Sequence, residues 1–480
     1  MVTGLVGRDL ISINDFTNEE VECLFHLADE MRLALRQGKQ LELCRGRDMA
    51  TLFYEPSTRT RGSFERAMHK LGGNVVSFAE AKTTSSAAKG ETIADTVRVL
   101  EHYADIIVIR HPWAGAAQVA ADYARVPVIN AGDGSHEHPT QTLCDLYTLR
   151  KEKGRIKGLT VVLWGDLKHG RTVHSLVYAL VRFGAQPLCC TEPDLYPPEA
   201  LVERLRTDYD HVLKKIEPRD LSSLIGRGDT DALYIAPFRP FQLRLPDLGL
   251  SVPIGDTTGW SKAKKVDAVY VTRLQRERMR TMDNGQAKYL ALNDGFWEEI
   301  KRKKRTLIMH PLPRVDELPY QIDTYPRSVY FEQAANGVPI RMALTALLLG
   351  AREMEVSKTR KGTLLYEKAE NRCKAAFGVE CSNQSCVSRQ ESERRYIVSA
   401  FNILKREPLV VSCIYCDSEA YPQYFASSEW HQGTLENKRY YPAHSFMKAR
   451  IRAENLVLFG SEEEAQRRGF HPSKHVAQGA

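Results

Sequence analysis

The chain has 480 residues, of which 43% are hydrophobic and 26% are charged, and its formal net charge at pH 7 is +7. This is the composition of an ordinary folded protein with room for roughly three domains of about 150 residues each. No apolar stretch approaches the ~18 residues of a membrane span, and the N-terminus lacks the apolar core of a signal peptide. We therefore expect a cytoplasmic protein that binds no membrane, and the absence of a long basic stripe argues against nucleic acid as a partner.

Near the N-terminus, a strand over residues 49–53 is followed by hydroxyl and guanidinium side chains at the start of a helix. The helix is indicated by the spacing of its apolar residues, Phe64, Ala67, Met68 and Leu71. A helix N-terminus offers free N–H groups and the positive end of a dipole, and arginine matches phosphate oxygens. Residues 57–63 include no acid, so we interpret them as an anion site, although a capped surface helix is the alternative. The candidate donors are Ser57, Thr58, Arg59, Thr60 and Arg61.

Short apolar runs then alternate with amphipathic helical stretches, which is typical of βα units in parallel sheets. Ligands of such sheets bind at the carboxyl ends of the strands. Basic and amide side chains follow several of these runs, so we expect them to meet in one site. The expected strands are 104–109, 126–130, 159–164, 232–236, 268–272 and 306–309. The side chains that follow them include Arg110, His138, Gln141, Arg171, Arg273 and Gln275, and the segment HPLPR at 310–314.

The segment EPSTRTRGSFE, residues 55–65, resembles the carbamoyl-phosphate loop of the transcarbamylases in its aspartate form, and the similarity covers about residues 5–350. The resemblance implies an α/β fold with two doubly wound parallel-sheet domains. Residues 1–150, together with 310–350, would form a carbamoyl-phosphate-binding domain. Residues 151–309 would form an aspartate-binding domain, and residues 351–376 a linker to the C-terminal part.

The activity that this resemblance implies is transfer of the carbamoyl group from carbamoyl phosphate to the amine of L-aspartate, the committed step of pyrimidine (UMP) synthesis. No catalytic cofactor is needed, because the enzyme holds two polyanions together and stabilises charge on one oxygen. The implied carbamoyl-phosphate ligands are Ser57, Thr58, Arg59, Thr60, Ser85, Lys89, Arg110, His138 and Gln141. The implied aspartate ligands are Lys89, Arg171, Arg273, Gln275, Leu312 and Pro313. The implied catalytic residues are Arg59, Thr60, Lys89, Arg110 and His138.

Lys89 lies in a loop of small residues, TTSSAAKGE at 83–91, and in isolation it would be interpreted as a solvated lysine. In the aspartate form of the family, this loop brings a serine and a lysine into the active site of the neighbouring subunit. Ser85 and Lys89 match those positions, so the resemblance implies a homotrimer with shared active sites. It also implies that Glu55 pairs with Arg171 and Arg278 across the gap between the domains.

Three alternatives remain at this point. An ornithine-type transcarbamylase usually has a cysteine in the late motif, where this chain has HPLPR, and it lacks the loop lysine. A non-catalytic scaffold for pathway proteins is a second alternative, against which the intact set of basic residues argues. A zinc ribbon that binds nucleic acid is a third.

Four of the ten cysteines form two close pairs, Cys381 with Cys386 and Cys413 with Cys416. Four thiolates on two turns satisfy tetrahedral zinc and leave no open position, so we expect one structural zinc ion per chain. Alternating residues at 396–401 and 409–414 predict two strands of a β domain at 377–420. This domain resembles the zinc domain of the regulatory chain of bacterial aspartate transcarbamylases, and we infer that it joins catalytic chains into a higher oligomer.

Residues 421–480 resemble small Ada-type metal-binding modules of α+β structure that have lost their metal cysteines. The positions of those cysteines are taken by Ser445, Ser473 and Val476. Residues 451–459 predict a strand, and Ser461 with Glu464 predicts a capping box that begins a short helix ending at Gly469. We expect the fold to be kept without a metal. The histidines interpreted as surface residues are His444, His471 and His475.

Overall fold

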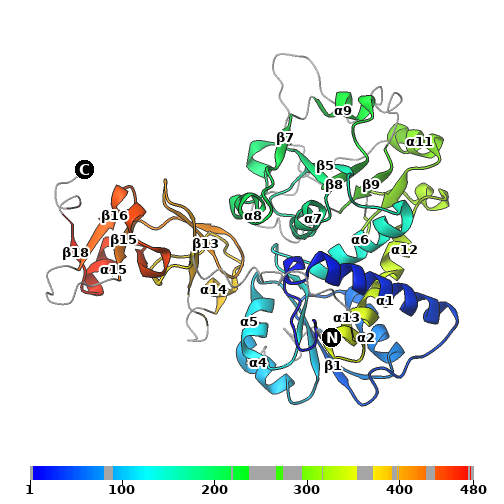
Figure 1. The fold of residues 1–480 in the computed structure, drawn as a ribbon, viewed down its shortest axis with the longest axis horizontal. Helices are drawn as coiled ribbons and strands as arrows, with labels where there is room; N and C mark the ends of the chain where they lie inside the picture. The colour runs from blue at the N-terminus through cyan, green and yellow to red at the C-terminus, as the bar shows by residue number, and fades with distance from the viewer. Residues whose placement is uncertain are drawn as a thin grey trace.

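The structure is a computed structural model that describes residues 4–79, 90–217, 220–236, 266–273, 294–315, 317–353, 371–391, 397, 399–428, 438–473 and 476. Two α/β domains lie side by side, and a smaller region extends from them toward the C-terminus (Figure 1). Most of the linker expected at 351–376 lies outside the described residues. None of the described helices is long and apolar enough to cross a membrane.

The first domain is built on a parallel sheet in the order β2-β1-β3-β4. Alternate residues of the buried strand β1 enter different cores, because successive side chains point to opposite faces. Met49 and Phe53 share a core with residues of α1 and α2, whereas Ala50 and Leu52 share one with residues of α4 and α5. The strands are β1 (Asp48–Phe53), β2 (Asn74–Phe78), β3 (Ile106–His111) and β4 (Val128–Asp133). The helices are α1 (Asn18–Arg36), α2 (Thr58–Lys70), α4 (Ile93–Leu100), α5 (Ala116–Tyr123) and α6 (Pro139–Lys153).

The second domain contains a six-stranded parallel sheet in the order β10-β9-β8-β5-β6-β7. Its strands are β5 (Thr160–Gly165), β6 (Gln186–Cys190), β7 (Lys214–Ile216), β8 (Ala232–Ala236), β9 (Ala268–Val271) and β10 (Leu307–Met309). The described helices are α7 (Arg171–Arg182), α8 (Glu199–Tyr209), α9 (Leu221–Arg227) and α11 (Asp294–Lys303).

The strands predicted between residues 104 and 309 each overlap an observed strand, with limits that differ by a few residues. They correspond to β3, β4, β5, β8, β9 and β10. Strands β2, β6 and β7 were not predicted from the sequence. These three lie at or next to an edge of their sheet, where an apolar run is not required on both faces.

The chain after β10 divides between the two domains. The 3₁₀ helix η6 (Tyr320–Thr324) follows Leu318, and both Leu318 and Ile322 pack in the core of the second domain. Helix α12 (Tyr330–Ala335) comes next, and α13 (Gly337–Leu348) then packs against α1 and α2 of the first domain. The return of the chain to the first domain is therefore made by α13.

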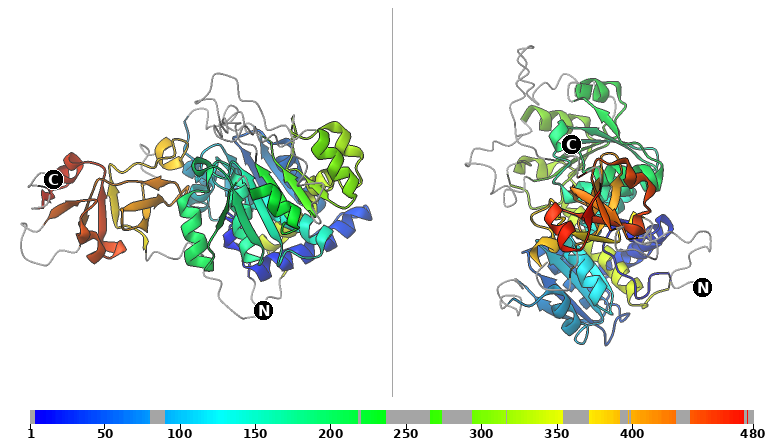
Figure 2. Two further views of the ribbon diagram at one scale, coloured as in Figure 1. Left: turned by 90° about the horizontal axis from the view of Figure 1, so that it is seen from above. Right: turned by 90° about the vertical axis from the view of Figure 1, so that its left-hand side faces the viewer.

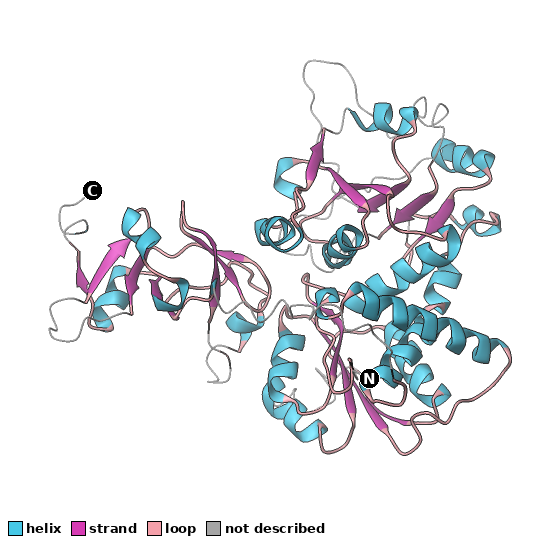
Figure 3. Cartoon of the chain, in the orientation of Figure 1, coloured by secondary structure: helices cyan, strands magenta, loops and turns pink. Residues whose placement is uncertain are grey.

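The C-terminal region is rich in short strands, which form two sheets (Figures 2 and 3). The first sheet has β12 (Phe401–Lys405), β13 (Val410–Cys413) and β14 (Glu419–Ala420), and the short helix α14 (Val387–Gln390) precedes it. The second sheet has β11 (Ala375–Phe377), β15 (Tyr424–Ser427), β16 (Arg439–Pro442), β17 (Leu456–Phe459) and β18 (His471–Pro472). Because β11 precedes the paired cysteines yet pairs with β17, the last module is not built from residues 421–480 alone.

Two strand predictions in this region were wrong in extent. The strand expected at 396–401 begins only at Phe401, and the described residues before it are not in a strand. The strand expected at 451–459 begins at Leu456, because residues 453–455 form a 3₁₀ turn. Helix α15 (Glu462–Arg467) begins where it was predicted, and the Ser461 hydroxyl accepts from the backbone N–H of Glu464. Only this half of the predicted capping box is formed, and the Glu464 carboxylate pairs with Arg467 and Arg468 instead.

The small domain that contains the four paired cysteines is called the metal domain below. It docks on the first domain through backbone contacts at the start of α5. Ala114 donates to the carbonyl of Ser385 and accepts from the N–H of Val387, at 2.9 and 3.0 Å. Gly115 lies in the left-handed region at φ +84°, and a Cβ there would come within 2.5 Å of Tyr415 Cβ. A glycine is therefore required at this contact both by the backbone conformation and by the space.

We expect Gly115→Ala to weaken this docking. Gly154→Ala is the matched control, since Gly154 has nearly the same backbone conformation, φ +73°, but a Cβ there would have nothing within 4 Å. Both variants carry a left-handed penalty of about 1–2 kcal/mol. Only Gly115→Ala adds the clash, so it should lower the thermal midpoint further and speed proteolytic release of the C-terminal region. Equal behaviour of the two variants would contradict this interface.

Candidate active site and metal site

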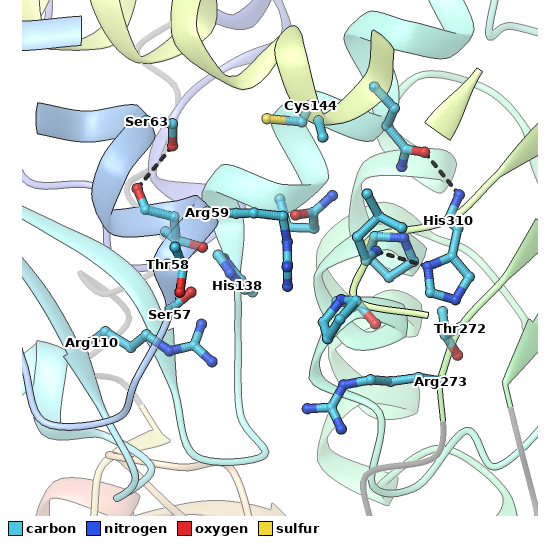
Figure 4. Close-up of a pocket in the computed structure, with 18 of the residues that line it drawn as sticks. Ser57, Thr58, Arg59, Ser63, Arg110, His138, Cys144, Thr272, Arg273 and His310 are labelled. Atoms are coloured by element: carbon cyan, nitrogen blue, oxygen red, sulfur yellow. Dashed lines mark hydrogen bonds between the residues drawn. The ribbon is translucent and has the colours of Figure 1, made fainter. Parts of the chain in front are cut away.

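A cavity of about 320 Å³ lies between the two α/β domains, at the carboxyl ends of their strands. Hydroxyl, guanidinium and imidazole groups line it from both sides, and the side chains of Arg110 and Arg273 reach toward it from opposite domains (Figure 4). The predicted residues that line this cavity are Ser57, Thr58, Arg59, Thr60, Arg110, His138, Gln141, Arg171, Arg273, Leu312 and Pro313. The structure therefore brings together the described members of both predicted ligand sets.

The first turn of α2 forms one wall of the cavity. Ser57 is the N-cap residue, but its hydroxyl makes no capping hydrogen bond, so the alternative of an ordinary capped surface helix is not supported. The helix has no acid in its first turn, and Thr60 is buried. A helix start that its own N-cap side chain leaves unsatisfied is a favourable place for a phosphate.

Several arginines surround the cavity, and one carboxylate balances two of them. Glu55 Oε2 lies 2.9 Å from Arg110 Nη2 and 3.5 Å from Arg171 Nη1. Gly132, at φ +113°, leaves room for both guanidiniums, since a Cβ there would lie 3.2 Å from each. Burial, and then the charge of Arg273, lower the pKa of Arg59. This repulsion between cations is what a bound polyanion would relieve.

His138 ends the loop that follows β4 and is the N-cap residue of α6. Its backbone N–H donates to Ser175 Oγ at 3.1 Å, and Ser175 in turn donates to Glu137 at 2.8 Å. Ser12 donates to the other oxygen of the same carboxylate at 2.6 Å. The loop is thus held from the N-terminal segment and from α7, which fixes the backbone that carries the imidazole at the cavity wall.

The HPLPR segment forms the opposite wall. His310 is buried, and its Nε2 lies 2.8 Å from Glu317, while its Nδ1 accepts from the backbone N–H of Leu312 at 2.8 Å. Burial is the largest influence on His310 and lowers its pKa. A neutral His310 therefore holds the turn that places Leu312 and Pro313 at the cavity.

Several buried polar residues around the cavity were not predicted from the sequence, and Asp145 and Arg341 are two of them. Asp145 Oδ1 accepts from Gln141 at 2.9 Å and from Gln333 at 2.7 Å, and its Oδ2 accepts from Tyr270 at 2.9 Å. Arg341 of α13 lines the cavity and lies over the Phe64 ring, 4.8 Å from its centroid. Neither residue belongs to a motif or follows a predicted strand, so no local signal marked them.

Some residues of the sequence prediction lie outside the described part of the chain. They are Ser85, Lys89, Gln275, Arg278 and His475. The predicted pairing of Glu55 with Arg171 is present, and the structure adds its pairing with Arg110.

The four paired cysteines form one buried cluster. Their sulfurs all lie within 4.8 Å of one another, with 3.4 Å between Cys381 and Cys416 and 3.7 Å between Cys386 and Cys413. Sulfurs at about 2.3 Å from a tetrahedral zinc would be about 3.8 Å apart, whereas a disulfide needs about 2 Å. The donors therefore fit a structural metal ion. Among the described residues no other group of this kind occurs, and His444 and His471 are exposed.

Comparison with known proteins places the chain in a class. Residues 8–152 match the carbamoyl-P binding domain, and residues 249–348 the Asp/Orn binding domain, of aspartate/ornithine carbamoyltransferases. Residues 376–423 match the metal binding domain of the aspartate carbamoyltransferase regulatory chain. The fold and the site therefore define a transcarbamylase, an enzyme, with a regulatory-chain type of metal domain in the same chain.

The relatives narrow this class. The aspartate carbamoyltransferase catalytic subunit of Thermococcus kodakarensis is 43% identical over 348 residues, which cover 72% of this chain and 97% of that protein. That of Methanopyrus kandleri is 44% identical and covers 73% and 99%. Among solved structures, Trypanosoma cruzi aspartate transcarbamoylase in complex with carbamoyl aspartate and phosphate has a TM-score of 0.57 at 34% identity, covering 72% and 97%. The chain belongs to the aspartate carbamoyltransferase family, and the ornithine-type alternative is set aside.

Asp145 gives a prediction about stability and pH. Burial raises its pKa from 3.8 to about 7, against the hydrogen bonds from Gln141, Gln333 and Tyr270. A carboxyl whose folded-state pKa is raised contributes stability that is fully present below pH 3.8 and is lost as pH rises toward 7, by about 4 kcal/mol in all. Asp145→Asn keeps an acceptor for both glutamines and cannot ionise.

We therefore expect the thermal midpoint of Asp145→Asn to gain on that of the wild type between pH 5 and about pH 7, and the difference to level off above that pH. Asp229→Asn, at a carboxyl that is 57% exposed, is the control and should not change the shape of the profile. Parallel profiles for the wild type and Asp145→Asn would show that Asp145 is ionised throughout this range.

Proposed function

We propose that this chain transfers the carbamoyl group of carbamoyl phosphate to the amine of L-aspartate, forming N-carbamoyl-L-aspartate and phosphate in pyrimidine synthesis. The observation that carries the proposal is the cavity lined by Arg59, Arg110, Arg171 and Arg273 together with the start of α2. Two substrates with several negative charges between them would match a space of this size and charge.

In the proposed reaction the amine nitrogen attacks the carbonyl carbon, the bond to the phosphate oxygen breaks, and the departing phosphate takes up the proton that the amine loses. The carbonyl oxygen, on which negative charge grows in the tetrahedral state, would be surrounded by Thr60, Arg110 and His138. Gln141, held by Asp145, would bind the carbamoyl amide. Placing both substrates against fixed donors removes much of the entropic barrier to their reaction. The phosphate would be bound by Ser57, Thr58, Arg59, Thr60 and Arg110.

Direct transfer between the substrates is supported by the state of a thiol in the cavity wall. Cys144 lines the cavity, but burial raises its pKa to about 11, so it is a neutral thiol at pH 7. A neutral thiol is a poor nucleophile, and a covalent carbamoyl-enzyme is not part of the proposal.

The acceptor side of the cavity supports a dicarboxylate. We propose that Arg171 and Arg273 bind the carboxylates of aspartate, with Gln275 beside them. The backbone carbonyls of Leu312 and Pro313 would accept hydrogen bonds from the incoming amine. Arginine pairs with carboxylate oxygens in a bidentate manner, which favours aspartate over an amine substrate with a positive side chain.

We also propose that the ion held by the four cysteines is zinc, one per chain, because four thiolates in tetrahedral arrangement favour it. Its role would be structural, because the four ligands complete its coordination and the small domain has few core residues of its own. We also propose that the protein is cytoplasmic and that this domain joins catalytic chains into a higher oligomer.

The function is tested by supplying carbamoyl phosphate with aspartate and, separately, with ornithine. We expect product with aspartate alone. Product with ornithine would overturn the assignment of the acceptor, and no product from the folded, metal-loaded protein would favour a scaffold.

Arg273→Ala tests the acceptor side directly. The variant should raise KM for aspartate by about tenfold or more and leave KM for carbamoyl phosphate within about twofold, because it removes a carboxylate contact worth about 1.5–3 kcal/mol. Arg155→Ala is the control, since it removes an exposed arginine outside the cavity lining. An equal rise in both KM values would contradict the assignment of Arg273 to aspartate.

The homotrimer with shared active sites is a further part of the proposal and rests on the match of Ser85 and Lys89 to the family loop. Lys89→Ala and Arg59→Ala should each be nearly inactive. Mixing and reassembling the two variants should restore part of the activity, because some sites then combine an intact Lys89 with an intact Arg59. No recovery in confirmed mixed trimers would place Lys89 in the site of its own subunit.

A further inference from the structure

Asp417 directly follows the last metal cysteine, and its side chain contacts both α/β domains. Its Oδ1 accepts from Arg204 Nη2 of α8 at 2.8 Å, and its Oδ2 lies 3.4 Å from His136 Nε2. Its backbone N–H donates to the carbonyl of Cys413, so the position of the carboxylate is set by the metal-binding turn. One side chain of the metal domain therefore joins the loop after β4 in the first domain to a helix of the second.

His136 belongs to the loop that ends at His138. Its Nδ1 lies 3.1 Å from Asp133 Oδ2, which also accepts from the N–H of Gly115 at 2.7 Å. The other oxygen of Asp133 accepts from the N–H of Glu137 at 3.1 Å and from Asn130 at 2.9 Å. The imidazole of His136 is thus held between two carboxylates and is nearly fully buried, with 9% of its side chain exposed.

The same loop therefore has one part held by the catalytic domains and one part that depends on the metal domain. Ser12 and Ser175 hold Glu137 from within the catalytic domains, whereas Asp417 holds His136 from the metal turn. Acidic and basic side chains alternate along this contact, in the order Asp133, His136, Asp417 and Arg204. Such an arrangement satisfies each polar group only when all three parts of the chain are in place.

We propose that Asp417 is a positioning residue for catalysis: it fixes the loop that carries His138 relative to α8, so the metal domain is part of the catalytic unit of its own chain. The role of His138 in this inference rests on the proposed function. A displacement of about 1 Å at a catalytic group is enough to slow a reaction by up to about a hundredfold. The metal domain then acts on the rate, and not only on the folding of the C-terminal region.

A second contact between the metal domain and α8 provides a matched control. Lys405 of β12 forms an ion pair with Glu199, the first residue of α8. Both side chains are about 40% exposed, and their pair lies apart from the hydrogen bonds that hold His136. Breaking this pair loosens the same two parts of the chain but leaves the contact with His136 intact.

The test is the Asp417→Asn variant, with its bound metal confirmed by metal analysis. Asparagine suits the left-handed backbone at Asp417, φ +57°, and has nearly the same volume, so the change is confined to the charge. We expect kcat to fall about tenfold while KM for carbamoyl phosphate stays within about twofold. Hydrogen exchange at the amides of His136 and Glu137 should become several-fold faster. Lys405→Ala should change neither kcat nor the rate of hydrogen exchange at these amides.

Arg204 provides an independent arm of the test. Arg204→Met should lower kcat, Arg204→Lys should recover part of the loss, and the double variant with Asp417→Asn should be little worse than Asp417→Asn alone. Additive losses would mean that the two residues act separately and would overturn the inference.

Two further outcomes would overturn the inference, and a third would bear on the proposed function. Wild-type kcat and exchange in Asp417→Asn would overturn the inference, as would a loss that appears equally in Lys405→Ala, since that would reflect docking in general. An inactive wild-type protein would instead refute the proposed function. The exchange measurement would then still show whether Asp417 holds the loop.

Discussion

The structure depends above all on keeping several arginines close together at the junction of two domains. Burial lowers the pKa of Arg59, and the like charge of Arg273 lowers it further. Glu55 offsets part of the positive charge by pairing with Arg110 and Arg171, one from each domain. The described residues that line the cavity include no acid, which is the physical reason that the site favours anions.

The two sheets supply the rigidity that this charge arrangement needs. Both sheets are parallel, and their carboxyl ends meet at the cavity, so side chains distant in sequence project into one space. Behind the cavity, Asp145 connects Gln141 of α6 with Tyr270 of β9 and Gln333 of α12. The donors are therefore fixed before any substrate arrives, which is the condition for electrostatic stabilisation of a transition state.

The metal domain is stabilised in a different way from the two larger domains. It has few residues for a core, and its cluster of cysteines takes the place of one, while its apolar residues join those of α4 and α5. Its docking uses backbone hydrogen bonds at Ala114 and a glycine at position 115, which bring the metal-binding turn close to the loop that carries His138. A domain of the type found in a regulatory chain lies here beside the loop that carries His138 in the same chain.

Local pattern and long-range packing contributed different parts of this protein. The spacing of Phe64, Ala67 and Met68 predicted α2, apolar runs predicted most central strands, and the cysteine pairs predicted the metal cluster. Motifs after strands identified most of the cavity residues, because the carboxyl ends of parallel strands lie at one edge. These features could be predicted because a few neighbouring residues specify each of them. Which distant residues meet was visible only in the folded chain, since Asp417 and His136 are 281 positions apart and Asp145 and Gln333 are 188 apart. A buried carboxylate cannot be distinguished from a solvated one in the sequence. Local patterns therefore indicated the candidate ligands of the site, whereas the residues that hold those ligands in place were visible only in the folded structure.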